Sequence, residues 1–372
     1  MAFAYLLPGF VLLVLGAEVL VRGAARLAAL LGITPLVIGL TVVAFGTSAP
    51  ETAVSIQAAF TGKGDLALGN VLGSNVANVL LILGATALVT PLVVSRQLIR
   101  LDVPLMVVAS LLVYGLAWDG ALGRAEGALL FACVVAYTAF QVVTSRRQGA
   151  AAAAAAADAA PDPGPDQADE FEREYGPRGG GGARVALTSA ALVLLGLALL
   201  IGGSQLLVEG AVMLARALGL SELVIGLTVV AVGTSLPELA TSLLAAWRGE
   251  RDIAVGNIVG SNIFNLLCVL GLGALAAPAP IAVASSALAF DFPVMSAVAL
   301  ACLPIFFTGY GIDRWEGALF LGYYAAYTTY LVLASTGRPF AEVFGQAMLG
   351  YVLPLTALTL VVIAARAWRR QA

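Results

Sequence analysis

Two carboxylates, Glu51 and Glu238, lie inside nearly identical apolar segments of the chain. Residues 36–51 read LVIGLTVVAFGTSAPE and residues 223–238 read LVIGLTVVAVGTSLPE, so only two of the sixteen positions differ. A carboxylate in such a segment is costly unless a cation or a proton offsets its charge. The matched pair therefore indicates a charge-binding site to which both copies contribute.

Further oxygen donors accompany each carboxylate. Thr47 precedes Glu51 by one helical turn, which places both side chains on the same helix face, and the second copy repeats this spacing. A second duplicated block, GNVLGSNVAN at 69–78 and GNIVGSNIFN at 256–265, adds a serine and an asparagine one turn apart. These oxygen donors suit Ca²⁺ or Na⁺ better than Mg²⁺. The candidate cation-binding side chains are Glu51, Glu238, Thr47, Ser48, Ser74, Asn78, Thr234, Ser235, Ser261 and Asn265.

A proline in each segment offers a way to expose backbone oxygens. Pro50 has no amide hydrogen, so the carbonyl of Gly46 loses its helical partner. We expect a locally broken helix with free carbonyls around Ala44 to Thr47, and Pro237 predicts the same break in the second copy. Irregular backbone within a membrane is tolerated only where it is buried or lines a cavity.

Helix packing is the alternative explanation for these patterns. GNVLG and GNIVG are also GxxxG motifs, which bring helices close together. Proline kinks occur in spans without any ligand, and Ser or Thr can bond back to its own helix. The duplication of a carboxylate, a proline break and a Ser/Asn face is nevertheless costly for packing alone and favours a binding site.

The composition requires a membrane in which these elements can lie. The chain has 372 residues, of which 60% are hydrophobic and 11% charged, and its mean hydropathy is +0.98. A soluble domain cannot hide so much apolar surface. The apolar runs do not alternate with polar residues, which excludes a transmembrane β-barrel. The chain contains no histidine, which excludes HExxH-type metal sites and histidine proton relays.

The predicted fold is an all-α polytopic membrane protein with two inverted five-helix repeats and an eleventh C-terminal helix. An odd number of spans in each repeat makes the second copy enter the membrane in the opposite direction. The predicted spans lie near residues 3–22, 33–60, 66–90, 103–118, 125–145, 184–215, 221–247, 252–277, 291–309, 314–335 and 345–365.

The repeats define the expected domain organisation. Residues 1–145 form the first repeat, 184–335 the second, and 336–372 the extra helix with a basic tail. Residues 146–183 include an all-alanine run, PDPGPD and GGGG, and we expect a flexible linker there. A partner-binding or calcium-sensing loop is the less favoured interpretation of this segment.

Basic residues orient the predicted spans. With the N-terminus outside, fifteen of the nineteen lysines and arginines fall on the inner face, as the positive-inside rule requires. We therefore expect a multi-pass protein of the cell membrane with the linker and the C-terminus in the cytoplasm. No lysine or arginine precedes Arg22, so the first apolar run is expected to be a retained span.

Other acidic residues are weaker candidates for the site. Asp102 and Asp291 stand at predicted span entrances, where a helix N-terminus favours negative charge. We interpret them as boundary or capping residues, together with Glu18, Glu209, Glu126 and Glu316.

At GTSAPE with GNVLGSNVAN, and at GTSLPE with GNIVGSNIFN, the chain resembles the cation/calcium exchanger superfamily, and within it a prokaryotic sodium/calcium exchanger. The resemblance covers about residues 1–335. It implies ten core helices around a buried ion pocket, and Ca²⁺ extrusion driven by entry of three Na⁺. It also implies alternating access, in which the first and sixth helices slide against the others.

The resemblance assigns roles to individual residues. Glu51 and Glu238 would bind Ca²⁺ with the carbonyls of Thr47 and Thr234, and Asn78 and Asn265 would line the centre. One set of Na⁺ ligands would be Thr47, Ser48, Ser261 and the carbonyl of Ala44. The other set would be Thr234, Ser235, Ser74 and the carbonyl of Ala231.

Two departures from the family pattern affect these expectations. Many relatives carry an aspartate where Asn265 stands, so this pocket holds at most two negative charges, and a K⁺ site is not expected. The eleventh span is not needed by the family core.

Three other functions stay open from the sequence. An H⁺/Ca²⁺ (or other divalent cation) antiporter could exchange protons on the two glutamates, although the GNxxEH pattern of that branch is absent. A membrane-embedded lipid-phosphate hydrolase would need a basic residue near the carboxylates. A passive channel would give currents far above the turnover of a carrier. We expect no enzyme activity, no cofactor and no nucleic-acid partner. The expected partners are Ca²⁺ and Na⁺ as substrates and the lipid bilayer, and the oligomeric state is left open.

Overall fold

The computed structural model describes residues 2–158, 182–218, 231–336, 340–356 and 358–359. It is a mostly helical membrane protein. Within these residues, eight helices are long and apolar enough to cross a membrane, and the bent pair Pro35–Thr47 and Ala49–Phe60 makes a ninth. The prediction of a polytopic helical protein is therefore confirmed.

The helices of the first half follow the predicted spans. In chain order the elements are α1 (Phe3–Leu31), α2 (Pro35–Ile38), η1 (Gly39–Val43), α3 (Ala44–Thr47), α4 (Ala49–Phe60), α5 (Gly64–Ala77), η2 (Asn78–Leu83), α6 (Gly84–Val89), β1 (Leu92–Val93), η3 (Leu98–Asp102), α7 (Val103–Leu116), β2 (Ala121–Leu122) and α8 (Arg124–Asp158). The η elements are π-helical turns within longer helices.

The second half repeats this order, and the last two elements given below follow it without a counterpart in the first half. Its elements are α10 (Gly182–Ala217), α12 (Ala231–Thr234), α13 (Leu236–Trp247), α14 (Arg251–Phe264), η5 (Asn265–Val269), α15 (Leu270–Ala276), β3 (Ile281–Ala282), η6 (Ala287–Asp291), α16 (Phe292–Phe307), β4 (Gly311–Ile312), α17 (Arg314–Ser335), α18 (Phe340–Ala347) and η7 (Met348–Val352). The first part of the predicted seventh span and most of the predicted eleventh beyond residue 356 lie outside the described residues.

The boundary of the predicted linker needs a correction. Helix α8 continues to Asp158, so residues 146–158 are helical although we expected a flexible segment there. Alanine has the highest intrinsic helix propensity, which explains why the all-alanine run extends the helix. The rest of the predicted linker, residues 159–181, lies outside the described residues.

Local sequence signals set several helix ends. Helix α1 ends at Gly32, whose φ of 62° is a left-handed conformation that glycine adopts without steric cost. Thr34 then caps α2, with Pro35 in its first turn, where the missing amide hydrogen has no cost. Asp313 and Glu316 form a capping box at the start of α17.

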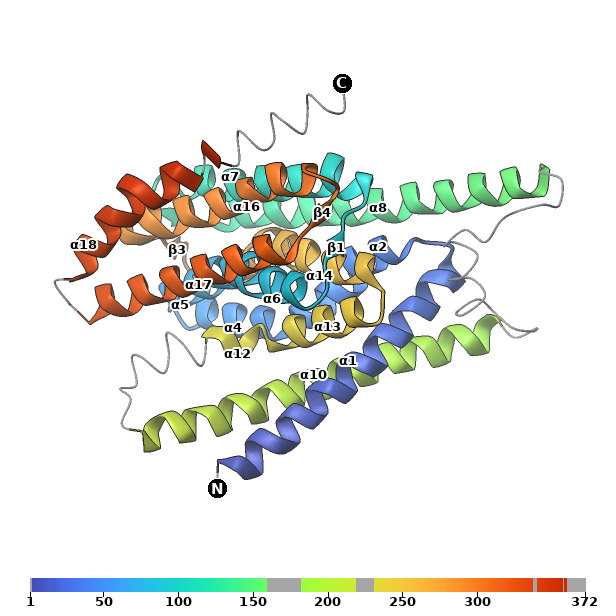
Figure 1. Cartoon of the computed structure of the whole chain (residues 1–372), viewed down its shortest axis with the longest axis horizontal. Coiled ribbons are helices and arrows are strands. Elements are labelled where there is room, and N and C mark those ends of the chain that lie inside the picture. The colour runs from blue at the N-terminus through green and yellow to red at the C-terminus, as the bar shows by residue number, and fades with distance from the viewer. Residues whose placement is uncertain (1, 159–181, 219–230, 337–339, 357, 360–372) are drawn as a thin grey trace.

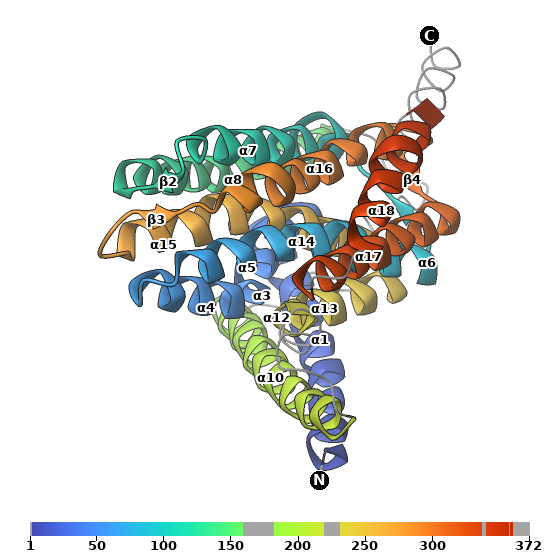
Figure 2. The same ribbon diagram turned by 90° about the vertical axis from the view of Figure 1, so that its left-hand side faces the viewer.

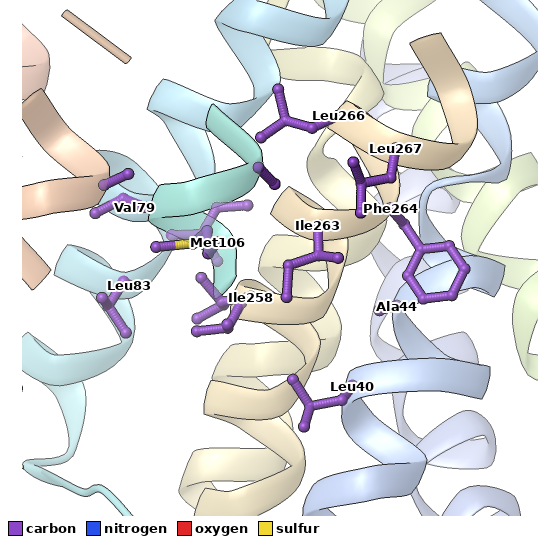
Figure 3. Close-up of a cluster of buried hydrophobic side chains, with 14 of the residues drawn as sticks. Leu40, Ala44, Val79, Leu83, Met106, Ile258, Ile263, Phe264, Leu266 and Leu267 are labelled. Atoms are coloured by element: carbon purple, nitrogen blue, oxygen red, sulfur yellow. The ribbon is translucent and has the colours of Figure 1, made fainter. Parts of the chain in front are cut away.

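The core surrounds α14, in which every residue from Ile253 to Phe264 is buried. Figure 3 shows Ile258 and Ile263 of this helix among Leu40 of η1, Met106 of α7 and other apolar side chains. The helix contacts elements of both halves, including η1, α13, η2 and α7. Helix α14 therefore holds the two halves together at the centre of the protein.

Two short antiparallel ladders also join the halves. Leu92 and Val93 of β1 pair with Ile312 and Gly311 of β4. In the second ladder, β2 pairs with β3 through Ala121 opposite Ala282 and Leu122 opposite Ile281. In each ladder, the first short strand of one half pairs with the second short strand of the other.

Helices α1 and α10 form a pair at one side of the protein (Figures 1 and 2), where both also contact α13. Glycines recur at every seventh position along their contact. A Cβ atom on Gly16 would lie 2.8 Å from the amide nitrogen of Leu200 and 2.9 Å from the carbonyl oxygen of Gly196. The two backbones touch directly, so this pair is tightly joined. The contact glycines are Gly9, Gly16, Gly23, Gly196, Gly203 and Gly210.

Candidate cation-binding site

The predicted helix break in the first copy is present. Helices α3 and α4 meet at Ser48 with a bend of 48°, and Pro50 lies in the first turn of α4. The carbonyl of Ala44 is not free, however, because the amide of Ser48 donates to it at 3.0 Å. The expectation of a free Ala44 carbonyl is corrected, because this oxygen accepts the helical bond from Ser48 and a second bond from the hydroxyl of Thr47 at 3.4 Å.

Each of the two carboxylates accepts a hydrogen bond from a serine of the other repeat copy. The hydroxyl of Ser48 donates to Oε1 of Glu238 at 3.0 Å, and the hydroxyl of Ser235 donates to Oε1 of Glu51 at 3.1 Å. Glu51 is 1% exposed and Glu238 is fully buried. The two sequence segments therefore meet in one buried centre.

Several buried oxygen atoms of the predicted site residues have no hydrogen-bond partner within the described residues. Burying a polar atom without a partner is costly, and burying a carboxylate oxygen more so. The ion pairs found among the described residues involve Glu18 and not these carboxylates. These buried oxygen atoms could therefore accept a cation as their missing partner. They are Oε2 of Glu51, Oε2 of Glu238, Oδ1 of Asn78, Oδ1 of Asn265 and Oγ of Ser261.

The composition of the centre limits its charge. No group of three or more His, Cys, Asp or Glu residues that could hold a metal occurs in the described parts of the chain. A cation held here therefore meets two carboxylates, with hydroxyls, amides and carbonyls as the other ligands. Two negative charges match one divalent ion, and Ca²⁺ accepts such mixed oxygen ligands.

Two more of the predicted side chains, Thr47 and Ser74, belong to the same network, whereas Asn78 donates to Asn262 at 3.1 Å. The hydroxyl of Thr47 lies 3.1 Å from Oδ1 of Asn257, and the hydroxyls of Ser235 and Ser74 are 3.4 Å apart. Asn78 and Asn265 stand at corresponding places, because each is the last residue of its duplicated block and begins a π-helical turn. Such turns often occur at functional sites because they reorient the side chains.

Two predicted positions are placed by the backbone. Helix α12 runs from Ala231 to Thr234, directly before Ser235, as α3 runs from Ala44 to Thr47 before Ser48. Ala231 and Thr234 therefore occupy the places equivalent to Ala44 and Thr47.

Two asparagines that the sequence interpretation missed support the carboxylate helices. The side-chain amide of Asn257 donates to the hydroxyl of Ser242 at 3.0 Å, while its oxygen faces Thr47. In the first copy, Asn70 donates to Ser55 at 2.9 Å and to the carbonyl of Glu51 at 3.2 Å. Each asparagine is the second residue of its duplicated block, at 69–78 or 256–265. This duplication could have identified them, but we attributed the GxxxG pattern that contains them to helix packing.

The interpretation of Asp102 as a capping residue is wrong. Its side chain is fully buried and makes no cap hydrogen bond. It accepts a hydrogen bond from Tyr137 at 3.0 Å and a second from Gln141, both on α8. The reason is that the helix begins earlier than predicted, so Asp102 lies inside the span and faces its neighbour. Glu126 and Glu316 do cap, each accepting a backbone amide of the preceding turn.

Comparison with known proteins gives a consistent result. A sequence model described as "Sodium/calcium exchanger protein" matches residues 1–143 and 188–333. The chain is 42% identical over 338 residues to the putative antiporter CaxA of Alkalimonas amylolytica, covering 90% of this chain and 99% of that protein. It is 34% identical over 356 residues to the sodium/calcium exchanger MaX1 of Methanosarcina acetivorans, covering 88% and 98%.

A solved structure shares the fold. The sodium-calcium exchanger NCX_Mj, soaked with Na⁺ and Ca²⁺, superposes with a TM-score of 0.70 at 28% identity, covering 91% of this chain and 98% of that one.

Proposed function

The chain belongs to the sodium/calcium exchanger family, and on this premise we propose that it is a secondary antiporter that exchanges Na⁺ for Ca²⁺. The observation that carries the proposal is the reciprocal pair of bonds between Ser48 and Glu238 and between Ser235 and Glu51. Each bond leaves the second oxygen of a buried carboxylate without a partner among the described residues. The names of the relatives CaxA and MaX1 support antiport.

The proposed stoichiometry is three Na⁺ for each Ca²⁺. Glu51 and Glu238 together neutralise one Ca²⁺, while Asn78 and Asn265 add oxygen atoms without charge. The hydroxyls of Thr47, Ser48, Ser74, Thr234, Ser235 and Ser261 provide the additional ligands for Na⁺, with the carbonyls of Ala44 and Ala231. One net charge then moves in each cycle, and the membrane potential contributes about 2.3 kcal/mol per 100 mV.

The proposed setting is the cell membrane, with the N-terminus outside and the central linker and C-terminus in the cytoplasm. The two halves are proposed to have inverted topology, so that the pocket opens to one face at a time. The swapped pairing of the short strands supports this proposal. This proposal assigns no role to the C-terminal helix.

A flux measurement in proteoliposomes tests the proposed function. Ca²⁺ uptake should follow an outward Na⁺ gradient, should increase when an inside-positive potential is imposed, because each cycle carries one net positive charge outward, and should not need a pH gradient. The direction of charge movement distinguishes this cycle from an electroneutral exchange of two protons for one Ca²⁺. Uptake driven by a pH gradient in the absence of Na⁺ would contradict Na⁺ coupling and favour the proton antiporter.

A further inference from the structure

A side-chain amide of the candidate site is held in one orientation by its neighbours. The amide nitrogen of Asn78 donates to Oδ1 of Asn262 at 3.1 Å, and the amide nitrogen of Asn262 donates to the sulfur of Met106 at 3.3 Å. All three side chains are buried, and Met106 belongs to the apolar cluster shown in Figure 3. The three residues therefore form a row of hydrogen bonds that leads from the apolar core to Asn78.

The direction of these bonds follows from the chemistry of the sulfur. An asparagine can turn either its oxygen or its nitrogen toward a neighbour, whereas a thioether sulfur only accepts hydrogen bonds. Met106 therefore requires the nitrogen of Asn262, which turns the oxygen of Asn262 toward Asn78. That oxygen in turn requires the nitrogen of Asn78. The remaining atom, Oδ1 of Asn78, is buried and has no partner among the described residues.

Asn78 lies where an oriented oxygen is useful to a cation. It begins η2, which contacts α13, the helix that carries Glu238. A cation is attracted by the oxygen end of an amide and repelled by the nitrogen end, which carries the hydrogens. Since the nitrogen of Asn78 is already engaged by Asn262, its oxygen needs no rotation to serve as a ligand.

The repeat equivalents of the two supporting residues are arranged differently. Asn75 corresponds to Asn262 (262 − 75 = 187), and its amide donates to the carbonyl of Val71 in its own helix at 2.8 Å. Met295 corresponds to Met106, since LDVPLM at 101–106 matches FDFPVM at 290–295. The amide that would repeat the row in the second copy is thus used for a bond within one helix.

The two central amides differ as a result. Asn265 corresponds to Asn78, and within the described residues neither its side-chain oxygen nor its nitrogen has a hydrogen-bond partner. Nothing in that part of the chain selects which end of this amide faces an ion. One central amide is therefore oriented in advance, and the other is free to turn.

We propose that Met106 and Asn262 are positioning residues that hold Asn78 as an oxygen ligand of the cation site, while Asn265 is the adaptable amide. The inference rests on the proposed exchange function, in which Asn78 gives an oxygen atom to the ion. It adds two residues that act on the ion through Asn78. The attraction between an ion and an amide dipole is proportional to the charge of the ion, so Ca²⁺ gains more from this orientation than Na⁺.

Removal of the sulfur tests how the row is anchored. Met106→Leu keeps a similar volume but offers Asn262 no acceptor, so both amides of the row become free to turn. We expect the Ca²⁺ affinity of the purified protein, measured by calorimetry in detergent, to fall about three- to tenfold, with a smaller change for Na⁺. Met295→Leu is the matched control and should retain the parent affinity for both ions.

A second pair of variants tests the middle of the row. Asn262→Ala removes the acceptor of the Asn78 amide and should lower the Ca²⁺ affinity about 10–100-fold, as is typical for loss of a residue that orients a ligand. Asn75→Ala removes an amide that bonds within its own helix, and it should retain the affinity. Thermal unfolding without Ca²⁺ verifies that each variant is folded, and calorimetry needs no transport.

Double variants separate orientation from packing. Asn78→Ala leaves no amide to orient, so neither Met106→Leu nor Asn262→Ala should lower its Ca²⁺ affinity further. In Asn265→Ala, both should cause the same loss as in the parent. The proposal is overturned if Met106→Leu binds Ca²⁺ as the parent does, if either loss persists in Asn78→Ala, or if the control variants lose as much affinity as their counterparts. Absence of Ca²⁺ binding or of Na⁺-driven Ca²⁺ uptake in the parent protein would instead refute the proposed function.

Discussion

The hydroxyl of Ser48 donates to Oε1 of Glu238, a carboxylate 190 residues further along the chain. Ser235 makes the reciprocal bond to Glu51 across 184 residues. Each half of the protein thus supplies a carboxylate and also the donor that orients the carboxylate of the other half. Neither half can arrange the centre alone.

Removal of either negative charge should prevent Ca²⁺ binding. Glu51→Gln and Glu238→Gln each leave a single carboxylate for a divalent ion, and loss of one partner from a buried charge pair costs about 3–5 kcal/mol. We expect the Ca²⁺ affinity, measured from uptake into proteoliposomes, to fall more than about a hundredfold in each variant.

Glu126→Gln is the matched control for this loss. Glu126 caps the amide of Gly123 at 2.9 Å and lies outside the cation centre. Its variant should retain Ca²⁺ affinity. Normal affinity in either Glu51→Gln or Glu238→Gln would show that the paired carboxylates do not hold the ion.

Asn257 should act on the site through its neighbours. It holds Thr47 with its oxygen and Ser242 with its amide, so Asn257→Ala removes one of the partners that orient the Thr47 hydroxyl, which also donates to the carbonyl of Ala44. Loss of a residue that orients a ligand typically costs about 10–100-fold in metal affinity, and we expect the same range here for Ca²⁺ uptake. Ser242→Ala removes only the distant partner and should have a smaller effect. An equal loss in the two variants would contradict this order.

Two adjacent glycines on α10 provide a test of the contact with α1. A Cβ on Gly203 would lie 2.8 Å from the amide nitrogen of Leu13 and 2.9 Å from the carbonyl oxygen of Gly9, whereas Gly202 faces open space. Overpacking against backbone typically costs about 1–3 kcal/mol, so Gly203→Ala should lower the unfolding temperature in detergent. Gly202→Ala should be neutral or stabilising by up to about 1 kcal/mol. The opposite order of the two melting temperatures would refute the direct backbone contact.

Asp102 should matter for folding and not for ion binding. Asp102→Leu leaves the hydroxyl of Tyr137 and the amide of Gln141 without their carboxylate partner, at a cost of about 1–3 kcal/mol. Asp102→Asn keeps one oxygen acceptor and should retain most of the stability and the Ca²⁺ affinity. Thermal unfolding and uptake measured on both variants separate the two roles. Loss of Ca²⁺ affinity in a folded Asp102→Asn variant would place this residue in the transport pathway.

The sequence allowed the spans and the break before Pro50 to be predicted because these depend on local properties. The length of an apolar segment predicts a membrane span, and the missing amide hydrogen of a proline predicts where the helical hydrogen bonds are interrupted. The pairing of Glu51 with Glu238 could also be expected, because a carboxylate within the membrane needs a cation to offset its charge, and two such carboxylates can share one cation. The bonds of Ser48 and Ser235 across the halves agree with that expectation.

Other features depend on contacts that no local pattern contains. Asp102 is buried against Tyr137 and Gln141 on another helix. The sequence does not show this contact, and an aspartate at the start of a helix is usually a capping residue. Asn257 was hidden in a motif that also explains close helix packing. The contacts of α10 with Gly46 and Gly233 could not be predicted, because the repeat alone favours a symmetric arrangement.

The two strand ladders have an evolutionary consequence. Each ladder needs one strand from each copy, because the short strands within one half do not pair with each other. An ancestor with a single copy would have exposed these edges unless a second molecule, inserted in the opposite sense, provided the partner strands. Fusion of the two genes would then have preserved an assembly that already existed between separate chains.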